Sequence, residues 1–534
     1  MTATSPHYVT LALAIWLACP ALLAVSAFPP VQEPGASQAT LQQITQSLER
    51  GDLEAASRVI EPALKTHPSD PVLHNLAGVV AAQRDEVESA EAHFQAAIRL
   101  APKSPAAYEN MGRLYQERAD GNPAMRAKAI AVYRQLLEVE PASVEGLFQS
   151  GFVLALDGQF AASRAMLERL SGEIGRSPRT QAVLAADLAG LGDTAGAQRV
   201  ITSLAGDPAL TEADVLSVLP VLPAGSGDPM AALMLEALSQ RKLMTGPGLR
   251  ALAAIYVRGG RPADARGLLE RAVTVGGASA PLLVELARTA ITLKDFQGAL
   301  GYLAHARSLD PANPTIHFLF GMVCVEENLG REAFDSMKKA VELDPDNPLI
   351  NYAMGAVATH RHEPSESLPY FRKYVQLRPD DPRGHFALGA ALFYSNEFDQ
   401  ARSELERAAG APETATGGHY FLARIARQAN DLDTARREIE TTLRLNPGLA
   451  DAWAELGLIQ TRSAEYAAAE ASLAKALAID PDHYLATLNL ATLYARTKDP
   501  RREAQAARVA ALGEKREARA QDFLRIIKAV PYEP

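Results

Sequence analysis

The histidines are the side chains of this sequence most suited to metal or acid–base chemistry. His360 and His362 flank Arg361, and such a pair can offer two imidazole nitrogens to a metal ion. A metal site also needs Cys, Asp or Glu ligands at a supporting spacing, and these are missing here. We therefore predict no metal site. An enzyme in which one of the two histidines works with a carboxylate stays open as a minor alternative.

The common catalytic and nucleotide-binding motifs are absent from the sequence. It contains no G-x-S-x-G nucleophile turn, no G-x-x-x-x-G-K-[ST] phosphate loop, no G-x-G-x-x-G dinucleotide loop and no H-E-x-x-H zinc helix. Acidic residues such as Glu326 and Glu327 lie on amphipathic faces, where a solvated role is more common than general acid catalysis. These observations predict a protein that is not an enzyme and binds no cofactor.

The composition favours an all-α chain without a nucleic-acid partner. A chain of 534 residues exceeds what one compact core supports, so several domains or a repeat array are expected. Hydrophobic residues make up 48% but aromatic residues only 6%, which suits many short helices packed through small side chains. The net charge is -10, and no dense Lys/Arg block could neutralise a row of phosphates.

Residues 1–27 predict export of the protein. Residues 9–27, VTLALAIWLACPALLAVSA, form an apolar run that ends in small residues suited to signal-peptide cleavage. Residues 28–40 would then form a Pro-rich linker. Two alternatives retain the segment: an uncleaved membrane anchor, or lipid modification at Cys19. Cleavage would leave the protein in the bacterial periplasm or at the cell surface, with Cys324 as a buried, unpaired thiol.

Small residues recur at a fixed interval along the C-terminal half of the chain. Five of them follow one another 34 residues apart: Gly321, Gly355, Gly389, Ala423 and Gly457. In the unit that begins at Pro314, the small residue is followed by Ala333, Met337, Ala340 and Pro345. Small residues let the two helices of a hairpin cross at close range, and Pro cannot continue the second helix. The pattern therefore predicts helix hairpins that bury their apolar faces by stacking.

This pattern resembles the tetratricopeptide repeat, a helix hairpin of 34 residues. A similar unit upstream contains Gly78, Ala90, Phe94, Ala97 and Pro102. The resemblance implies an all-α fold, a right-handed α-solenoid of about fourteen stacked hairpins.

The repeat pattern also suggests where the parts of the chain begin and end. Pro220, Pro223, Gly225 and Gly227 interrupt the pattern in the middle of the array. We expect an N-terminal block over residues 41–208, a degenerate hairpin or hinge over 209–245, a C-terminal block over 246–517, and a capping helix and tail over 518–534.

In proteins of this family, the first helix of each hairpin lines a concave groove. By resemblance, four aromatic side chains would point into the groove: Phe318, Tyr352, Phe386 and Tyr420. Phe393, Tyr394, Arg424 and Arg427 lie further along the same helices and could add a cationic edge. The alternative interpretation is that these rings only fill space between adjacent first helices.

The resemblance also indicates the roles of two further groups of residues. The Lys or Arg residues with which some members of the family clamp a C-terminal carboxylate are replaced here by Asn75, Glu109, Phe148, Ala182 and Ala454. The position in the first helix at which the family usually has an aromatic residue is occupied here by His74, His317, His385, His419 and Trp453. We expect these side chains to pack against neighbouring helices rather than to bind a ligand.

The sequence therefore predicts a non-enzymatic scaffold for a peptide or protein partner, in bacterial envelope assembly or secretion. A scaffold that handles exopolysaccharide is an alternative, because stacked aromatic side chains also suit sugar rings. Contact with a membrane is expected only through residues 9–27, if they are retained.

Overall fold

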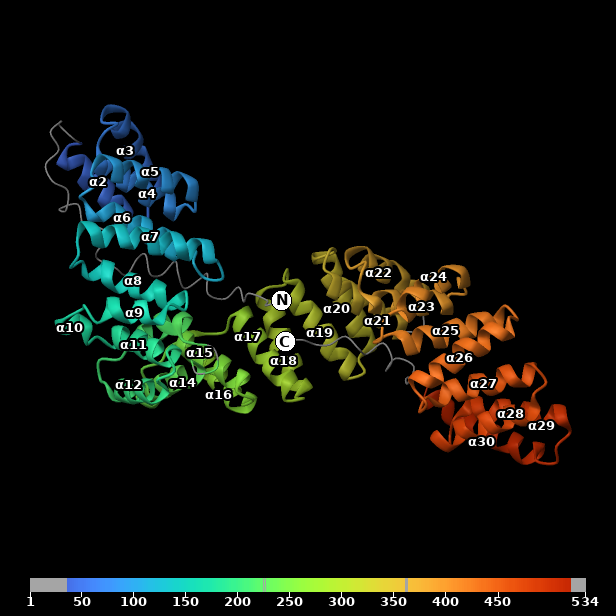
Figure 1. Cartoon of the computed structure of the whole chain (residues 1–534). Coiled ribbons are helices and arrows are strands. Elements are labelled where there is room, and N and C mark those ends of the chain that lie inside the picture. The colour runs from blue at the N-terminus through green and yellow to red at the C-terminus, as the bar shows by residue number, and fades with distance from the viewer. Residues whose placement is uncertain (1–35, 224, 226, 361–363, 520–534) are drawn as a thin grey trace. The chain divides into compact units, whose positions relative to one another are not determined.

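The computed structural model of the chain describes residues 36–223, 225, 227–360 and 364–519, and within these ranges every regular element is a helix (Figure 1). The prediction of an all-α fold of stacked hairpins is confirmed. The chain divides into two compact units, residues 1–276 and 277–534. The irregular segment 209–245, expected to be a hinge, lies inside the first unit.

The first unit contains helix pairs up to the end of α16. Its elements are α2 (Gln38–Glu49), α3 (Leu53–Thr66), α4 (Pro71–Gln83), α5 (Val87–Leu100), α6 (Pro105–Gln116), α7 (Pro123–Val139), α8 (Val144–Leu156), α9 (Phe160–Leu167), α10 (Gly172–Gly175), α11 (Pro178–Gly190), α12 (Thr194–Gly206), α13 (Glu212–Val218), the 3₁₀ helix η3 (Leu219–Val221), α14 (Gly227–Gln240), α15 (Gly246–Arg258) and α16 (Pro262–Gly276).

The second unit follows the 34-residue pattern more regularly. Its elements are α17 (Ala280–Thr292), α18 (Phe296–Leu309), α19 (Pro314–Glu326), α20 (Gly330–Leu343), α21 (Pro348–His360), α22 (Pro364–Leu377), α23 (Pro382–Tyr394), α24 (Phe398–Ala409), α25 (Ala415–Gln428), α26 (Leu432–Leu445), α27 (Ala450–Arg462), α28 (Tyr466–Ile479), α29 (Tyr484–Thr497) and α30 (Arg502–Arg519).

Many first helices begin at an Asx–Pro or Ser–Pro step. The carboxylate of Asp70 accepts hydrogen bonds from two backbone N–H groups at the start of α4, and that of Asp381 accepts one at the start of α23. Pro occupies the first turn, where no helical partner for its missing N–H is needed. These caps explain why α4 and α23 begin where the sequence pattern places them.

The predicted small residues lie where the two helices of a hairpin cross. A β-carbon added to Gly355 would lie 2.6 Å from the Phe371 ring, and one added to Gly389 would lie 2.6 Å from Cγ of Leu405. Gly321 faces Met337 in the same way, at 3.0 Å. In each hairpin the glycine makes room for a large side chain of the second helix, which confirms the reason given for its small size.

The turn between the two helices of a hairpin contains one residue in the left-handed region. Gly158 and Gly192 adopt this conformation in the first unit. In the second unit the position is occupied by residues that have a β-carbon: Lys294, Asn328, Asn396, Asn430, Ala464 and Lys498. These turns therefore carry backbone strain that glycine would not have.

A second recurring contact ties each first helix to the segment before it. Nε1 of Trp453 donates to the carbonyl oxygen of Pro447 at 2.9 Å, and Nδ2 of Asn351 donates to that of Pro345 at 2.9 Å. A ring nitrogen of His317 contacts the Pro311 carbonyl oxygen at 2.9 Å. In all three pairs the partners are six residues apart. A side chain at this position of the first helix therefore has a structural role, because it binds the carbonyl oxygen of the preceding proline.

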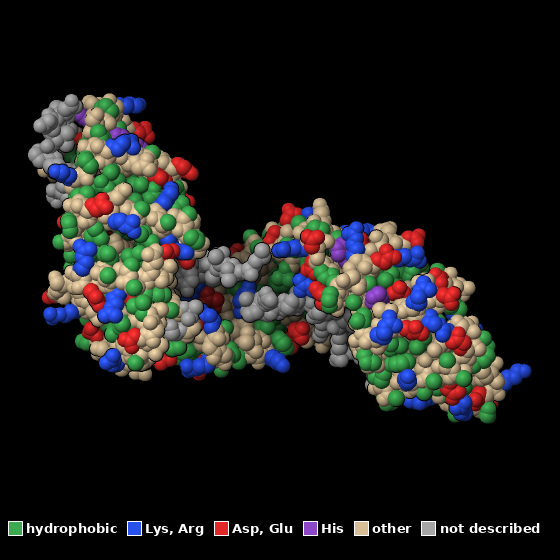
Figure 2. All heavy atoms as spheres, in the orientation of Figure 1, with side chains coloured by type: hydrophobic (Ala, Val, Ile, Leu, Met, Phe, Trp, Pro, Cys, Tyr) green, Lys and Arg blue, Asp and Glu red, His purple; other side chains and the backbone are tan. Residues whose placement is uncertain are grey.

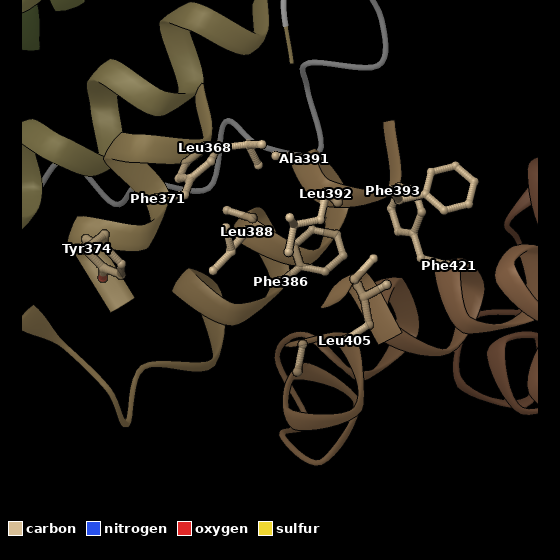
Figure 3. Close-up of a cluster of buried hydrophobic side chains, with 14 of the residues drawn as sticks. Leu368, Phe371, Tyr374, Phe386, Leu388, Ala391, Leu392, Phe393, Leu405 and Phe421 are labelled. Atoms are coloured by element: carbon tan, nitrogen blue, oxygen red, sulfur yellow. The ribbon is translucent and has the colours of Figure 1, made fainter. Parts of the chain in front are cut away.

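The core of the second unit contains large apolar side chains between the glycine crossings (Figure 3). Phe371 of α22 is fully buried, Leu405 of α24 fills the crossing at Gly389, and Phe421 of α25 meets Phe393 of α23 with ring centroids 5.3 Å apart. Alternating small and large side chains thus join one hairpin to the next.

The first helix begins earlier than expected, and most of the two chain ends lies outside the residues that the structure describes. Helix α2 begins at Gln38, inside the expected linker, because Ser37 caps it by accepting from the N–H of Thr40 at 3.2 Å. In the degenerate hairpin, α13 and η3 replace a full first helix. The predicted signal peptide and most of the capping segment 518–534 lie outside the described residues. No helix of the described ranges is long and apolar enough to cross a membrane.

Candidate functional site

The most distinctive group of polar and aromatic side chains in the second unit surrounds Arg424 of α25. Its guanidinium lies 4.5 Å from the ring centroid of Phe393 and 5.6 Å from that of Tyr420. The rings of Tyr394 and Phe421 lie at 5.7 Å and 5.5 Å. Because aromatic faces carry negative electrostatic potential, they attract the cation from several sides. We call these five residues the arginine–aromatic cluster.

Hydrogen bonding fixes the orientation of Arg424 without neutralising it. Its Nη1 donates to the hydroxyl of Tyr394 at 3.2 Å. Within the described part of the chain, no carboxylate forms an ion pair with Arg424. Arg424 is partly exposed, and a guanidinium has five N–H donors, so donors remain that an incoming carboxylate or carbonyl group could use.

The tyrosines of the cluster can act as hydrogen-bond donors at any physiological pH. Burial raises the pKa of Tyr394 and raises that of Tyr420 well above its usual range. Both side chains nevertheless keep part of their surface exposed. Their phenols stay protonated and offer an apolar face together with an O–H group.

Arg427, also predicted to contact a partner, is used inside the protein. Its Nε forms a short ion pair with Oε1 of Glu455 on α27, and the two side chains are only 12% and 10% exposed. Arg462 of α27 donates to the backbone carbonyl of Arg427 at 3.1 Å. Arg427 therefore joins α25 to α27 and leaves Arg424 as the available cation.

Three of the four rings predicted to form an aromatic stripe are buried. Phe318, Tyr352 and Phe386 expose only 7%, 6% and 9% of their surface. Tyr352 packs edge-on against Phe371 and Tyr374 of α22, with ring centroids 5.7 Å and 5.0 Å apart. The structure does not bring the four rings into one exposed stripe. Tyr352 is covered by its own second helix, whereas Phe386 packs against the first helix of the next hairpin, α25. For these three rings, burial fits the packing interpretation.

The first unit has a polar network that sequence reasoning missed. Asn110 of α6 donates to Asn75 of α4 at 3.1 Å, Gln116 of α6 donates to Gln149 of α8 at 2.8 Å, and Arg113 pairs with Glu145 at 3.1 Å. The partners lie on successive first helices and are separated by 32 to 35 residues. Polar residues that recur near the repeat length were the signal that could have revealed this network.

Two carboxyl groups of the first unit lack full hydrogen bonding. Burial raises the pKa of Glu117 to about 7, and its Oε1 has no partner within the described residues. Burial also raises the pKa of Asp187 to about 7, although Ser163 donates to its Oδ2 at 2.8 Å. These groups are sites of electrostatic strain inside the helix stack.

The structure adds little to the candidate metal and thiol chemistry. The side chains of His360 and His362 lie outside the part of the chain that the structure describes. Elsewhere in the described ranges, no group of three or more His, Cys, Asp or Glu side chains could hold a metal ion. Cys324 is fully buried, and burial raises the pKa of its thiol to about 11, as expected for an unreactive packing residue.

Sequence comparison identifies the helix hairpins. The family model of the tetratricopeptide repeat matches residues 43–105, 250–314, 386–450 and 420–482. The chain is a tetratricopeptide repeat protein. The matches fall in both units, and they include the crossing at Gly389 and the turns at Lys294, Asn396, Asn430 and Ala464. A search of curated proteins gave no match.

Solved structures of similar fold include other tetratricopeptide repeat proteins. The C-terminal part of a repeat protein from Cytophaga hutchinsonii is 14% identical, with 43% of this chain and 94% of that chain covered and a TM-score of 0.38. The Cut9–Hcn1 hetero-tetramer is 14% identical, with 91% of this chain and 99% of that chain covered and a TM-score of 0.37. PilW, a type IV pilus biogenesis factor, is 22% identical, with 40% of this chain and 98% of that chain covered and a TM-score of 0.35. These likenesses concern the fold.

Proposed function

We propose that this tetratricopeptide repeat protein is a non-enzymatic scaffold that holds an extended peptide or protein partner at the arginine–aromatic cluster. The repeats support the general role of a protein-interaction scaffold. The observation that carries the finer proposal is Arg424, a partly exposed cation among four aromatic rings with no carboxylate partner in the described chain.

The chemistry of the cluster selects the kind of partner. A carboxylate can replace the water that solvates Arg424, and an aromatic side chain can stack on the exposed part of Tyr420. We therefore expect a partner segment that combines an acidic and an aromatic residue. Export to the periplasm or cell surface, and a role in bacterial envelope assembly, belong to the same proposal and rest on residues 1–27.

Photo-crosslinking in the producing cell tests the proposal directly. A benzophenone amino acid in place of Tyr420 should crosslink one partner polypeptide, and Arg424→Gln in the same chain should reduce the yield about tenfold or more. The matched control is Arg437→Gln, which removes the same charge from an exposed position on α26.

The possible outcomes separate the candidate functions. Equal crosslinking in both glutamine variants, or none in the natural protein, would refute the contact role of the cluster. Retention of polysaccharide without any protein would favour the alternative scaffold, since the partly exposed tyrosines also suit sugar rings. Cell fractionation with and without residues 1–27 tests the location separately.

A further inference from the structure

A cavity of about 580 Å³, open to solvent, lies in the first unit and is lined by residues of α14, α15, α16 and the turn between α15 and α16. Figure 1 labels these three helices. It is independent of the arginine–aromatic cluster, which belongs to the second unit. The lining residues from α14 belong to the irregular segment 209–245, in which α13 and η3 replace a full first helix. Its volume is within the range of pockets that bind small organic molecules.

Part of the lining of the cavity is apolar. Leu252 of α15 and Leu268 of α16 line it and expose only 1% and 8% of their surface. Tyr256 adds an aromatic wall, and its hydroxyl donates to Oε1 of Glu236 on α14 at 2.7 Å. A hydrocarbon portion of a ligand could cover this apolar part and displace water from it.

The lining carries more positive than negative charge. Arg261, Arg271 and Glu236 are the charged residues of the lining. Arg261 is already used, because its Nε donates to Asp264 at 2.8 Å and its guanidinium stacks on the Tyr256 ring at 3.9 Å. Glu236 accepts from Tyr256. The lining charge that stays without a counterpart is therefore that of Arg271.

Arg271 is held in place by a neutral group. Its Nη1 donates to the hydroxyl of Ser239 on α14 at 3.0 Å, and both side chains line the cavity. Across the ranges that the structure describes, no carboxylate forms an ion pair with Arg271. A guanidinium has five N–H donors in a planar fork, so most of them stay available to an anion.

We propose that this cavity binds a small amphipathic anion, with its carboxylate or phosphate group on Arg271 and its apolar body on Leu252 and Leu268. The fork of Arg271 fits a carboxylate or phosphate in a bidentate geometry. Ser239 orients the guanidinium and can donate to the same anion by rotation of its hydroxyl. The ligand site and the partner surface are then two separate functions of one chain.

Titration of the full-length protein with simple probes tests the proposal. Octanoate and octyl phosphate carry both required parts, whereas acetate lacks the apolar body and 1-octanol lacks the charge. Ligand-observed NMR should give saturable binding of the two amphipathic anions with a Kd of roughly a millimolar or below. Acetate and octanol should bind at least about tenfold more weakly. The stronger of the two anions identifies the preferred head group.

Variants of helix α16 provide the matched comparison. Arg271→Gln should weaken octanoate binding about tenfold or more. Arg266→Gln removes the same charge on the same helix, from an arginine that pairs with Glu270 outside the cavity, and should change the affinity less than about twofold. Ser239→Leu, which fills the cavity from α14, should abolish binding while the circular dichroism spectrum stays helical.

The outcomes are decisive in either direction. Loss of binding in Arg271→Gln and Ser239→Leu, with retention in Arg266→Gln, would support the site. Equal binding of octanol and octanoate, unchanged affinity of Arg271→Gln, or no saturable binding of either anion would overturn it.

Discussion

Asp187 shows how one side chain can set the pH response of a helix stack. It is fully buried, and one of its oxygens lacks a partner within the described residues. Because burial raises its pKa to about 7, the folded state holds the proton more tightly than the unfolded chain does. Its contribution to stability is therefore most favourable below about pH 4 and is lost as the pH rises through about 7.

We expect Asp187→Asn to remove this pH dependence. At pH 8 the variant should gain about 2 kcal/mol relative to the natural protein, whereas at pH 5 the difference should be small. Glu117 titrates in the same range, so the comparison uses the difference between the urea midpoints of the two proteins at each pH. A difference that does not grow between pH 5 and pH 8 would contradict the assignment.

The ion pair of Arg427 and Glu455 makes a second prediction about single residues. Arg427→Met leaves the Glu455 carboxylate buried without its partner and should destabilise the second unit by about 3–5 kcal/mol. Adding Glu455→Leu removes the stranded charge and should restore most of this loss. Thermal unfolding followed by circular dichroism measures both effects. If the Arg427→Met, Glu455→Leu double variant is as unstable as Arg427→Met alone, the unpaired Glu455 charge is not the cause of the lost stability.

The turns between paired helices carry strain that can be relieved. Ala464 has φ of +60°, a conformation that costs an L-residue about 1–2 kcal/mol. Ala464→Gly should therefore stabilise the second unit by about 1 kcal/mol, even though glycine usually weakens folded structure.

The control for this turn lies in the following helix. Ala471→Gly, at an exposed position inside α28, should destabilise the unit by about 1 kcal/mol. Hydrogen exchange of α27 and α28, or a shift of the urea midpoint, distinguishes the two signs. If both variants destabilise the protein, the strain at residue 464 is offset elsewhere.

Helix crossings give the opposite response to added volume. Gly389→Ala would place a β-carbon 2.6 Å from Cγ of Leu405, which should cost about 1–3 kcal/mol because the core is already filled. Leu405→Val in the same chain makes room and should recover part of the loss. Thermal unfolding of the single and double variants measures this coupling.

The helix pairs could be predicted from the sequence, whereas the surface of the candidate site could not. The 34-residue recurrence of Gly or Ala is a local property, and it placed the crossings at Gly355 and Gly389 correctly. Exposure of Tyr352 depends on Phe371 and Tyr374, whose sizes matter only once the second helix is packed against it. Likewise, the two arginines Arg424 and Arg427 lie about one turn apart on α25, and their different roles depend on the packed neighbours: aromatic rings around Arg424 and Glu455 beside Arg427.

Across the whole molecule, the two compact units organise both stability and function. Because each hairpin stacks on its neighbours, unfolding is expected to be cooperative within a unit and not across all 534 residues. Asp187→Asn should therefore alter the unfolding of residues 36–276, and Ala464→Gly that of residues 277–519. Hydrogen exchange resolved by peptide under mild urea checks this. A single transition that both substitutions shift equally would contradict independent units.

The surface charge in Figure 2 is mixed in both units. On the face shown, Lys and Arg side chains are interspersed with Asp and Glu side chains. This face offers no continuous basic stripe of the kind that follows a nucleic-acid backbone. On this face, charge alone therefore marks no extended binding surface.

The glycine crossings have a genetic consequence. Gly355 and Phe371, or Gly389 and Leu405, are encoded within the same stretch of about 34 codons. A duplication of such a stretch copies the glycine together with the large side chain that packs against it. The gene can therefore grow or shrink by whole repeats without a second, compensating mutation at each new crossing.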